Sequence, residues 1–434
     1  MSNPAEDFLT GRWRFLWNRF VKQIWFRASL FSLAAIAVAL IGAFLPTYLP
    51  FPLELELAAG SVNSLLTILA SSMLAVTTFS LSIMVNAYAA AATNSTPRAT
   101  ALLIEDSVAS NTLATFLGSF LFSIVGLVGI SAQIYGEQGR ILLFVSTLVV
   151  LFMVTAALLR WVEQLTRFGR VGDTIKRVEQ SASSVINSWA RSPRLGCERR
   201  PEDYPDDCAP LHATKVGYVQ HIDVEALNAL AEKSGGAVHI RKGPGAFVSP
   251  DTVLALMETE PEGDGRKDMR NCFSVGAARS YDQDPAFGLV VLSEIASRAL
   301  SPAVNDPGTA VQVITSGVRV FQNYCSGIEQ RADPTFHHLT MDDVDHGELL
   351  EDFFAPIARD GAGLLEVQLR VQKGLEMIAL AHREHFGNSA KKIAALSLKR
   401  ALKELDGPLE QTRLKKSFGW DLPDAVTGER ESEL

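Results

Sequence analysis

The densest group of side chains that could do chemistry lies in two short stretches, RSYDQDPAFG and ALSPAVNDPGTA. Each stretch contains an aspartate followed by a proline, at Asp284-Pro285 and at Asp306-Pro307. This pair is typical of a helix N-terminus, because the carboxylate accepts free amide N–H groups and proline has no N–H that needs a partner. A second interpretation is that the polar residues converge on a buried turn that binds an ion or a partner loop. The candidate residues of this turn are Arg279, Asp282, Asp284, Ser301, Asn305 and Asp306.

A second candidate group consists of hydroxyl side chains inside very apolar segments. Residues 57–97 contain no Asp, Glu, Lys or Arg, and about 20 apolar residues are enough for a helix to cross a bilayer. On a helix of 3.6 residues per turn, the hydroxyls of this segment share one face, and two more share a face of the next apolar segment. Such stripes either pack against neighbouring helices or line water, and both interpretations remain open. The residues are Thr67, Ser71, Thr78 and Ser82, then Thr115 and Ser119.

Metal ligands and catalytic groups are weakly indicated. His382 and His385 are three residues apart on an expected helix, but no third ligand is evident. The acidic, histidine-bearing stretch 337–346 is expected to be a solvated surface loop. We therefore predict no metal, no cofactor and no catalytic residues, and an enzyme is the least favoured class.

Four membrane spans are expected, at 28–46, 61–92, 112–134 and 141–160. Basic residues are concentrated before the first span and after the fourth, whereas the first loop, 47–60, has none. Because Lys and Arg favour the cytoplasmic side, both termini are predicted to be cytoplasmic. Residues 1–27 place aromatic and basic side chains on opposite faces, which predicts an amphipathic helix in the membrane interface. Apart from Arg160, the last residue of the fourth span, no Asp, Glu, Lys, Arg or His lies inside the four spans, which argues against ion-coupled transport.

The sequence after the spans predicts a cytoplasmic α+β domain. Strand-like runs and glycine turns fill the first part, and apolar stripes at helical spacing fill the second. One of these helices is expected to pair Glu294 with Arg298 at i,i+4. The expected fold class is an α-helical membrane domain of four transmembrane helices, followed by a cytoplasmic α+β domain with a small β-rich part and a helical C-terminal part. The predicted boundaries are 1–27 (interfacial helix), 28–165 (membrane domain), 166–211 (helical exit and linker), 212–280 (β-rich), 281–420 (helical) and 421–434 (tail).

Charge and cysteine usage restrict the class of protein further. The formal net charge of −8 argues against a nucleic-acid partner. The four cysteines, at 197, 208, 272 and 325, form no CxxC pair, which fits a reducing compartment rather than a disulfide framework.

The run ALSPAVNDPGTA, with RSYDQDPAFG before it and TNSTPRA at the end of the second span, resembles a family of bacterial predicted inner-membrane proteins that carry a domain of unknown function. The resemblance extends from the first span to beyond residue 325. Members of that family commonly have a bulkier residue where Gly308 stands and Ser where Thr96 stands. The resemblance implies a multi-span module in the bacterial inner membrane followed by a cytoplasmic domain, and it implies no activity or catalytic residue.

We therefore predict a homo-oligomeric ion channel, or a channel-like pore, with a cytoplasmic regulatory domain. Its partners would be the lipid bilayer, other copies of the chain and an inorganic ion. The order of spans, β-rich part and helical part resembles small-conductance mechanosensitive channels by analogy only. The alternative is a membrane-anchored sensor or scaffold that acts through its cytoplasmic domain without transport. A solute transporter is a third, weaker interpretation.

Overall fold

The structure, a computed structural model, describes residues 26, 29–30, 32–34, 36–37, 59–104, 107–166, 169–202, 205 and 207–420. The chain forms two compact units, which we describe separately. The apolar helical unit contains the described residues up to 93 together with 100–173. The α/β unit contains Asn94–Ala99 and the chain from Thr174 onwards. The predicted interfacial helix and the tail lie outside the described residues, apart from Phe26, which is helical.

The apolar helical unit contains α4 (Ala59–Asn94), α5 (Thr100–Ile104), α6 (Ser107–Ser131) and α7 (Glu137–Leu165). Within the described residues, three helical stretches are long and apolar enough to cross a membrane: Gly60–Asn94, Thr100–Ser131 and Gly139–Leu165. They correspond to the second, third and fourth predicted spans. The first predicted span, 28–46, lies mostly outside the described residues, so three of the four expected spans are found.

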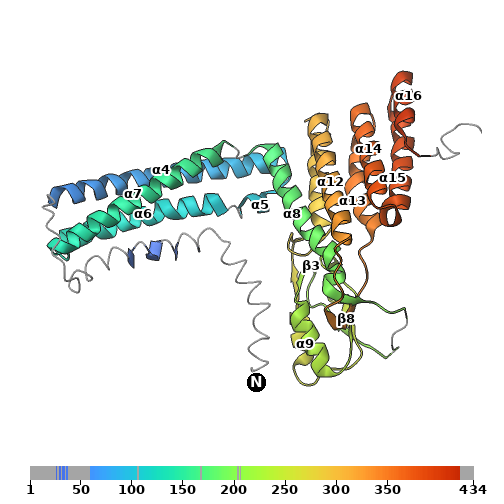
Figure 1. The fold of residues 1–434 in the computed structure, drawn as a ribbon, viewed down its shortest axis with the longest axis horizontal. Helices are drawn as coiled ribbons and strands as arrows, with labels where there is room; N and C mark the ends of the chain where they lie inside the picture. The colour runs from blue at the N-terminus through green and yellow to red at the C-terminus, as the bar shows by residue number, and fades with distance from the viewer. Residues whose placement is uncertain are drawn as a thin grey trace, which may run out of the picture. The chain divides into compact units, whose positions relative to one another are not determined.

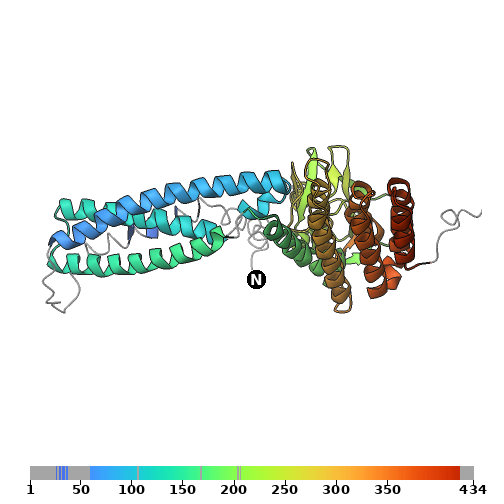
Figure 2. The same ribbon diagram turned by 90° about the horizontal axis from the view of Figure 1, so that it is seen from above.

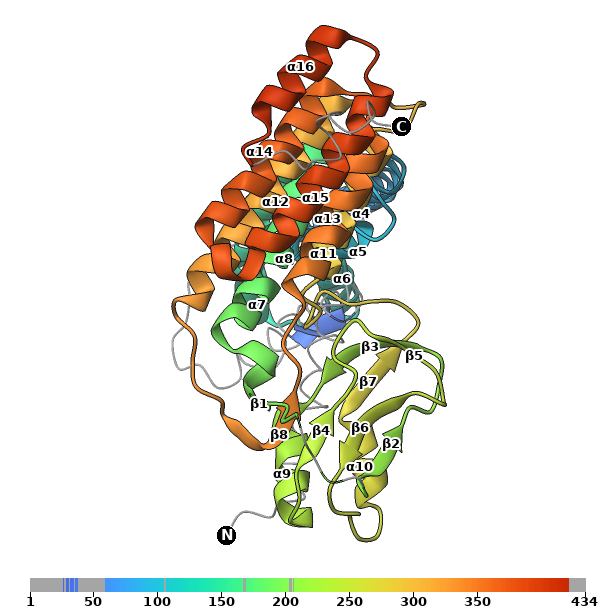
Figure 3. The same cartoon turned by 90° about the vertical axis from the view of Figure 1, so that its right-hand side faces the viewer.

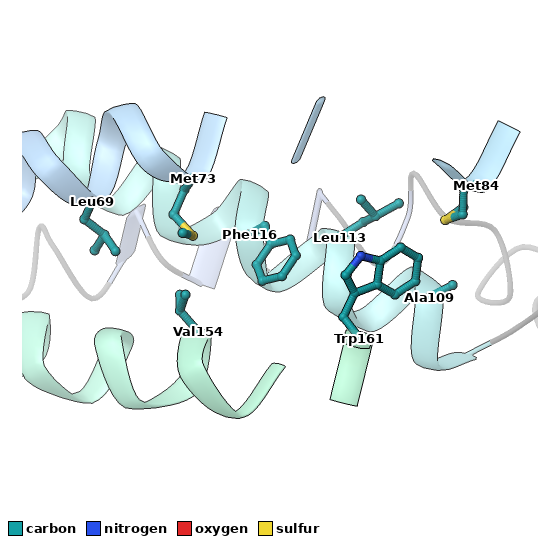
Figure 4. Packing of buried hydrophobic residues seen from close by; sticks show 8 residues of the cluster. All are labelled: Leu69, Met73, Met84, Ala109, Leu113, Phe116, Val154 and Trp161. Atoms are coloured by element: carbon teal, nitrogen blue, oxygen red, sulfur yellow. The ribbon is translucent and has the colours of Figure 1, made fainter. Parts of the chain in front are cut away.

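The long helices α4, α6 and α7 run side by side (Figures 1 and 2) and bury apolar side chains between them. One cluster joins Leu69, Met73 and Met84 of α4 to Ala109, Leu113 and Phe116 of α6 and to Val154 and Trp161 of α7 (Figure 4). A second cluster contains Val62, Leu66, Phe122, Tyr135 and Leu143. Each cluster contains side chains from α4, α6 and α7, and the second also includes Tyr135 of the α6–α7 connection. The three helices therefore form one packed bundle.

The sheets of the α/β unit appear in Figure 3. A five-stranded sheet has the order β1-β8-β4-β6-β2, and a three-stranded sheet has the order β5-β3-β7. β8 is parallel to both β1 and β4, whereas the other neighbours are antiparallel. The strands are β1 (Cys197–Arg199), β2 (Ala209–His212), β3 (Gly217–Ile222), β4 (Val238–Ile240), β5 (Phe247–Val248), β6 (Val253–Met257), β7 (Phe273–Gly276) and β8 (Phe336–Met341).

The segment predicted as a helical exit and linker, 166–211, is more ordered than expected. It contains the predicted helix, α8 (Val171–Arg191), whose apolar stripe is buried. It then forms a short 3₁₀ helix, η2 (Pro193–Gly196), and both edge strands of the five-stranded sheet, β1 and β2. The physical reason is long-range pairing: β1 binds β8, which is far along the chain, and no local periodicity signals a three-residue strand.

The remaining helices are α9 (Val224–Ser234), α10 (Gly265–Asn271), α11 (Phe287–Ala299), α12 (Pro307–Ile328), α13 (His346–Asp360), α14 (Leu365–Ala381), α15 (Arg383–Glu404) and α16 (Pro408–Ser417). α9 starts and ends at local capping residues: Asp223 accepts the amide of Ala226, and Gly235 ends the helix with φ +73°. Phe321, Phe353, Phe354 and Phe386 form the aromatic centre of the helical layer. Because β8 lies within the predicted helical part yet pairs with β4, the β-rich and helical parts form one unit.

Candidate functional site

The four hydroxyl residues of α4 share an exposed face. Thr67, Ser71, Thr78 and Ser82 are all exposed, while the opposite face of α4 supplies the buried cluster residues. Thr67 Oγ1 donates to Asn63 O at 2.8 Å, and Thr78 Oγ1 donates to Leu74 O at 2.9 Å. These internal hydrogen bonds lower the cost of placing hydroxyls in an apolar surrounding. The stripe therefore does not pack against α6 or α7, and it remains available to water, lipid or another copy of the chain.

The hydroxyls of α6 occupy a different environment. Ser119 is buried and donates to Thr115 O at 2.7 Å, while Thr115 Oγ1 donates to Asn111 O at 2.8 Å. Both side chains line a cavity of about 330 Å³ whose other walls include Phe122, Val149 and Met153. The six predicted hydroxyls therefore divide into an exposed set on α4 and a set that faces a mainly apolar cavity.

Asp284 is fully engaged within the α/β unit. It is buried, and its carboxylate accepts Arg279 Nε at 2.6 Å and Arg279 Nη2 at 2.8 Å. The same carboxylate accepts the amides of Ala286 and Phe287 at the start of α11, each at 3.1 Å. The aspartate thus satisfies free N–H groups of a helix, as predicted, with Arg279 balancing its charge.

The turn between α11 and α12 is exposed rather than buried. Residues 302–306 are all exposed, and Asn305 has a left-handed backbone with φ +48°. Asp306 caps α12 by accepting the amide of Thr309 at 3.0 Å and its hydroxyl at 2.6 Å. These hydrogen bonds from Thr309 lower the pKa of Asp306. Asp306 and Pro307 therefore hold the N-cap and the first helical position of α12, whereas Pro285 directly precedes Ala286, the N-cap of α11, so that the other Asp-Pro pair lies just before its helix.

The other residues predicted for this turn bind close neighbours. Asp282 is exposed and accepts the Ser280 hydroxyl, and Ser301 Oγ donates to Arg298 O at 2.7 Å. The structure places Arg279 with Asp284, and Asp306 with Thr309, in separate sets of hydrogen bonds.

A contact that the sequence reasoning missed involves Asn94–Ala99, the connection that follows α4. Arg98 Nη1 lies 2.6 Å from Glu294 Oε1, and Thr96 Oγ1 donates to Glu294 Oε2 at 2.9 Å. Tyr281 Oη donates to Arg98 O at 3.3 Å. Burial and the nearby Glu294 carboxylate raise the pKa of Tyr281, which keeps the phenol protonated as a donor. Glu294 therefore pairs with Arg98, whereas the sequence suggested Arg298.

The only sequence signal for this contact was the motif TNSTPRA, which contains Thr96 and Arg98. The motif carries no indication of its partner, because Glu294 is nearly 200 positions away along the chain. Periodicity alone could not have paired them.

An apolar unit with three candidate spans, joined to an α/β unit, defines this chain as a membrane protein in contact with the lipid bilayer. It belongs to the DUF2254 family, described as predicted membrane proteins. The sequence model of this family matches residues 21–377.

Several proteins with sequences similar to this chain are uncharacterized proteins of mycobacteria. Mb1321c of Mycobacterium bovis and Rv1290c of Mycobacterium tuberculosis are each 36% identical to this chain over 120 residues. The match covers 26% of this chain and 23% of each relative, so it spans about a quarter of either protein. No solved structure matches the chain.

Proposed function

We propose that the chain is a homo-oligomeric ion channel, or a channel-like pore, in the bacterial inner membrane. The α/β unit would be its cytoplasmic regulatory domain. The observation that carries this proposal is the exposed hydroxyl face of α4, formed by Thr67, Ser71, Thr78 and Ser82. Several copies arranged with this face toward a common axis would surround a path lined with uncharged polar groups. Such a lining offers oxygen atoms to a passing ion without the cost of an intramembrane charge.

The connection Asn94–Ala99 supports a regulatory role for the α/β unit. It continues directly from α4, and its Thr96 and Arg98 are bound by Glu294 of α11. A shift of α11 would therefore act on the residues that immediately follow the proposed pore helix. This would let a change in the α/β unit alter the position of the α4 end.

Cysteine scanning tests the pore assignment. Thr67, Ser71, Thr78 and Ser82 are each replaced by cysteine in a background in which the four native cysteines are changed to serine. We expect modification of these positions by a charged, membrane-impermeant thiol reagent in liposomes, together with reduced ion flux. Leu66→Cys is the matched control, because Leu66 is fully buried against the bundle. Protection of all four hydroxyl positions would overturn the pore assignment.

The alternative function, a membrane-anchored sensor or scaffold without transport, is favoured by one observation. The α/β unit has its own sheets and its own aromatic centre, so it has the structure of an independent module. Absence of ion flux in liposomes that contain correctly folded, oligomeric protein would favour this alternative.

A further inference from the structure

A cavity of about 320 Å³ lies inside the α/β unit, apart from the Glu294 and Asp284 contacts. It forms where the end of α8, η2, the end of α12, the β8–α13 connection and the start of α15 meet. Its volume is in the range of sites for small molecules. The polar side chains of its lining are Arg194, Tyr324, Arg331, Asp343, His346, Glu384 and His385.

Three guanidinium groups converge on one carboxylate, Asp343, at this cavity. The buried Arg194 places Nη1 2.5 Å from Asp343 Oδ1, and its Nε donates to Cys197 O at 3.2 Å. Arg199 and Arg331 approach the same carboxylate, at 3.7 Å and 4.0 Å. Of these groups, Arg194 and Arg331 line the cavity, together with the carboxylates of Asp343 and Glu384. A guanidinium group carries five N–H donors, and those that Asp343 does not accept can donate to an anionic ligand.

The start of α15 adds to this preference. His382 is the N-cap of this helix but makes no side-chain capping hydrogen bond, and the next turn contributes Glu384 and His385 to the cavity wall. Free amides and the helix dipole make such a terminus attractive to anions. In addition, His385 Nδ1 is buried without a hydrogen-bond partner, and Tyr324 Oη lies 2.9 Å from His346 Nε2. A buried imidazole nitrogen without a partner can donate a hydrogen bond to a bound ligand or accept one from it.

The backbone that presents Arg194 is strained. Arg194 and Leu195 have φ values of +57° and +58°, although neither is glycine. Left-handed backbone costs a residue with a side chain about 1–2 kcal/mol. Such strain persists only where the surrounding structure holds the backbone in place. Here the strained residue Arg194 places its buried guanidinium group in the cavity wall.

The three histidines near the cavity do not form a metal site. The ring centroids of His346 and His385 are 4.7 Å apart, and those of His382 and His385 are 4.3 Å apart, in edge-to-face arrangements. In the part of the chain that the structure describes, no group of three or more His, Cys, Asp or Glu residues is arranged to hold a metal ion. Of the three, His346 and His385 line the cavity, and His385 Nδ1 is available for a hydrogen bond to a ligand.

We propose that this cavity binds a small phosphate-bearing molecule with an apolar body. Arg194, Arg331, His385 and the α15 N-terminus would hold the phosphate, whose three oxygen atoms match several converging donors. Trp189, Ile328 and Val344 supply an apolar wall for the rest of the molecule. The site is independent of the proposed pore, because it lies wholly within the α/β unit.

Isothermal titration calorimetry on the full chain in detergent tests this proposal, with adenosine monophosphate, inorganic phosphate and adenosine as probes. We expect saturable binding of the monophosphate, weaker binding of phosphate and the weakest binding of adenosine. Arg331→Gln and His385→Gln should each weaken the binding of the monophosphate about tenfold or more, as loss of a hydrogen bond to a charged group does. Arg331 is suited to substitution because its side chain is 44% exposed, so the variant should fold.

Arg370→Gln is the matched control, since Arg370 is exposed on α14 and does not line the cavity. It should bind the monophosphate like the unmodified chain. The proposal is overturned if neither phosphate-bearing probe binds saturably, or if adenosine binds as tightly as its monophosphate. Unchanged affinity in both Arg331→Gln and His385→Gln would also overturn it.

Discussion

At the scale of single residues, Asp284 connects the start of α11 to Arg279. Because the carboxylate is buried and accepts four hydrogen bonds, replacing it by asparagine leaves Arg279 without its counter-charge. We expect Asp284→Asn to lower the free energy of unfolding by about 3 kcal/mol. Thermal unfolding of the full chain in detergent measures this. Asp282→Asn, at an exposed position two residues earlier, should change stability little, and equal effects of the two changes would contradict the structural role of Asp284.

His346 makes the stability of the α/β unit depend on pH. Burial, together with the neighbouring His385 and His382, lowers the pKa of His346 from its ordinary 6.5 to about 4, although Asp343 and Asp345 act in the opposite direction. Burial also lowers the pKa of His385. Between pH 6.5 and about 4, His346 therefore binds a proton more readily in the unfolded chain than in the folded chain. Stability is complete above about pH 6.5 and decreases as the pH falls toward 4.

The contribution of His346 to this decrease should reach at most about 3 kcal/mol. We expect His346→Gln to flatten the dependence of the unfolding temperature on pH between 7.5 and 4.5. His337→Gln is the comparison, because the His337 side chain is 71% exposed on β8. The same slope in the unmodified chain and in His346→Gln would show that another group is responsible.

At the scale of elements, the connection Asn94–Ala99 is held on α11 by one carboxylate. In Glu294→Gln, the amide can still accept the Thr96 hydroxyl, but the charge that holds Arg98 is lost. Because Arg98 is 59% exposed, the change in overall stability should stay below about 1 kcal/mol. Amide hydrogen exchange at residues 95–99 should nevertheless become faster, since these amides depend on the local contact.

Mass spectrometry of exchanged peptides measures this effect in the full chain in detergent. Glu404→Gln, at an exposed position near the end of α15, should leave exchange at residues 95–99 unchanged. If Glu294→Gln also leaves it unchanged, the carboxylate does not hold the connection.

The elements that the sequence predicted well are those whose signals are local. The strand β3, the capped helix α9 and the long helices α11, α12, α14 and α15 follow from periodicity and from capping residues such as Asp223 and Asp306. The acidic stretch before residue 346 contains two features that its composition did not indicate: His337 and His338 lie in the first half of strand β8, whose second half is buried, and Asp345 caps α13. Their polar composition indicates a loop, and only pairing with β1 and β4 makes β8 a strand.

The candidate sites show the same limit. The helix-capping role of Asp306 could be predicted, because a cap involves residues two or three positions away. Asp284 was predicted at a helix start and accepts amides there, although Ala286 holds the N-cap position of α11. The partnership of Glu294 with Arg98, and the cavity around Arg194, could not be predicted. Each depends on side chains brought together from distant segments, and no spacing rule connects them.

At the scale of the whole molecule, the α/β unit should fold without the membrane spans. Its sheets and its aromatic centre all lie between residues 174 and 420, and among the described residues only the short connection Asn94–Ala99 is supplied from elsewhere. We expect a fragment of residues 174–420 to be soluble, to unfold cooperatively and to elute as a defined species in gel filtration. Circular dichroism and size-exclusion chromatography check this. Aggregation, or loss of structure without a cooperative transition, would show that the unit depends on the rest of the chain.

The two outer strands of the five-stranded sheet restrict how copies of this chain can associate. β1 has only three residues and carries Glu198 and Arg199, while β2 contains Pro210, which has no N–H to offer. Arg266 and Arg270, from α10, donate to the carbonyls of Pro210 and His212 and so occupy acceptors along β2. Neither border is suited to backbone ladders with a neighbouring protein. We therefore expect copies of this chain to associate through helix surfaces rather than by strand addition. This limits the formation of β-sheet aggregates between copies.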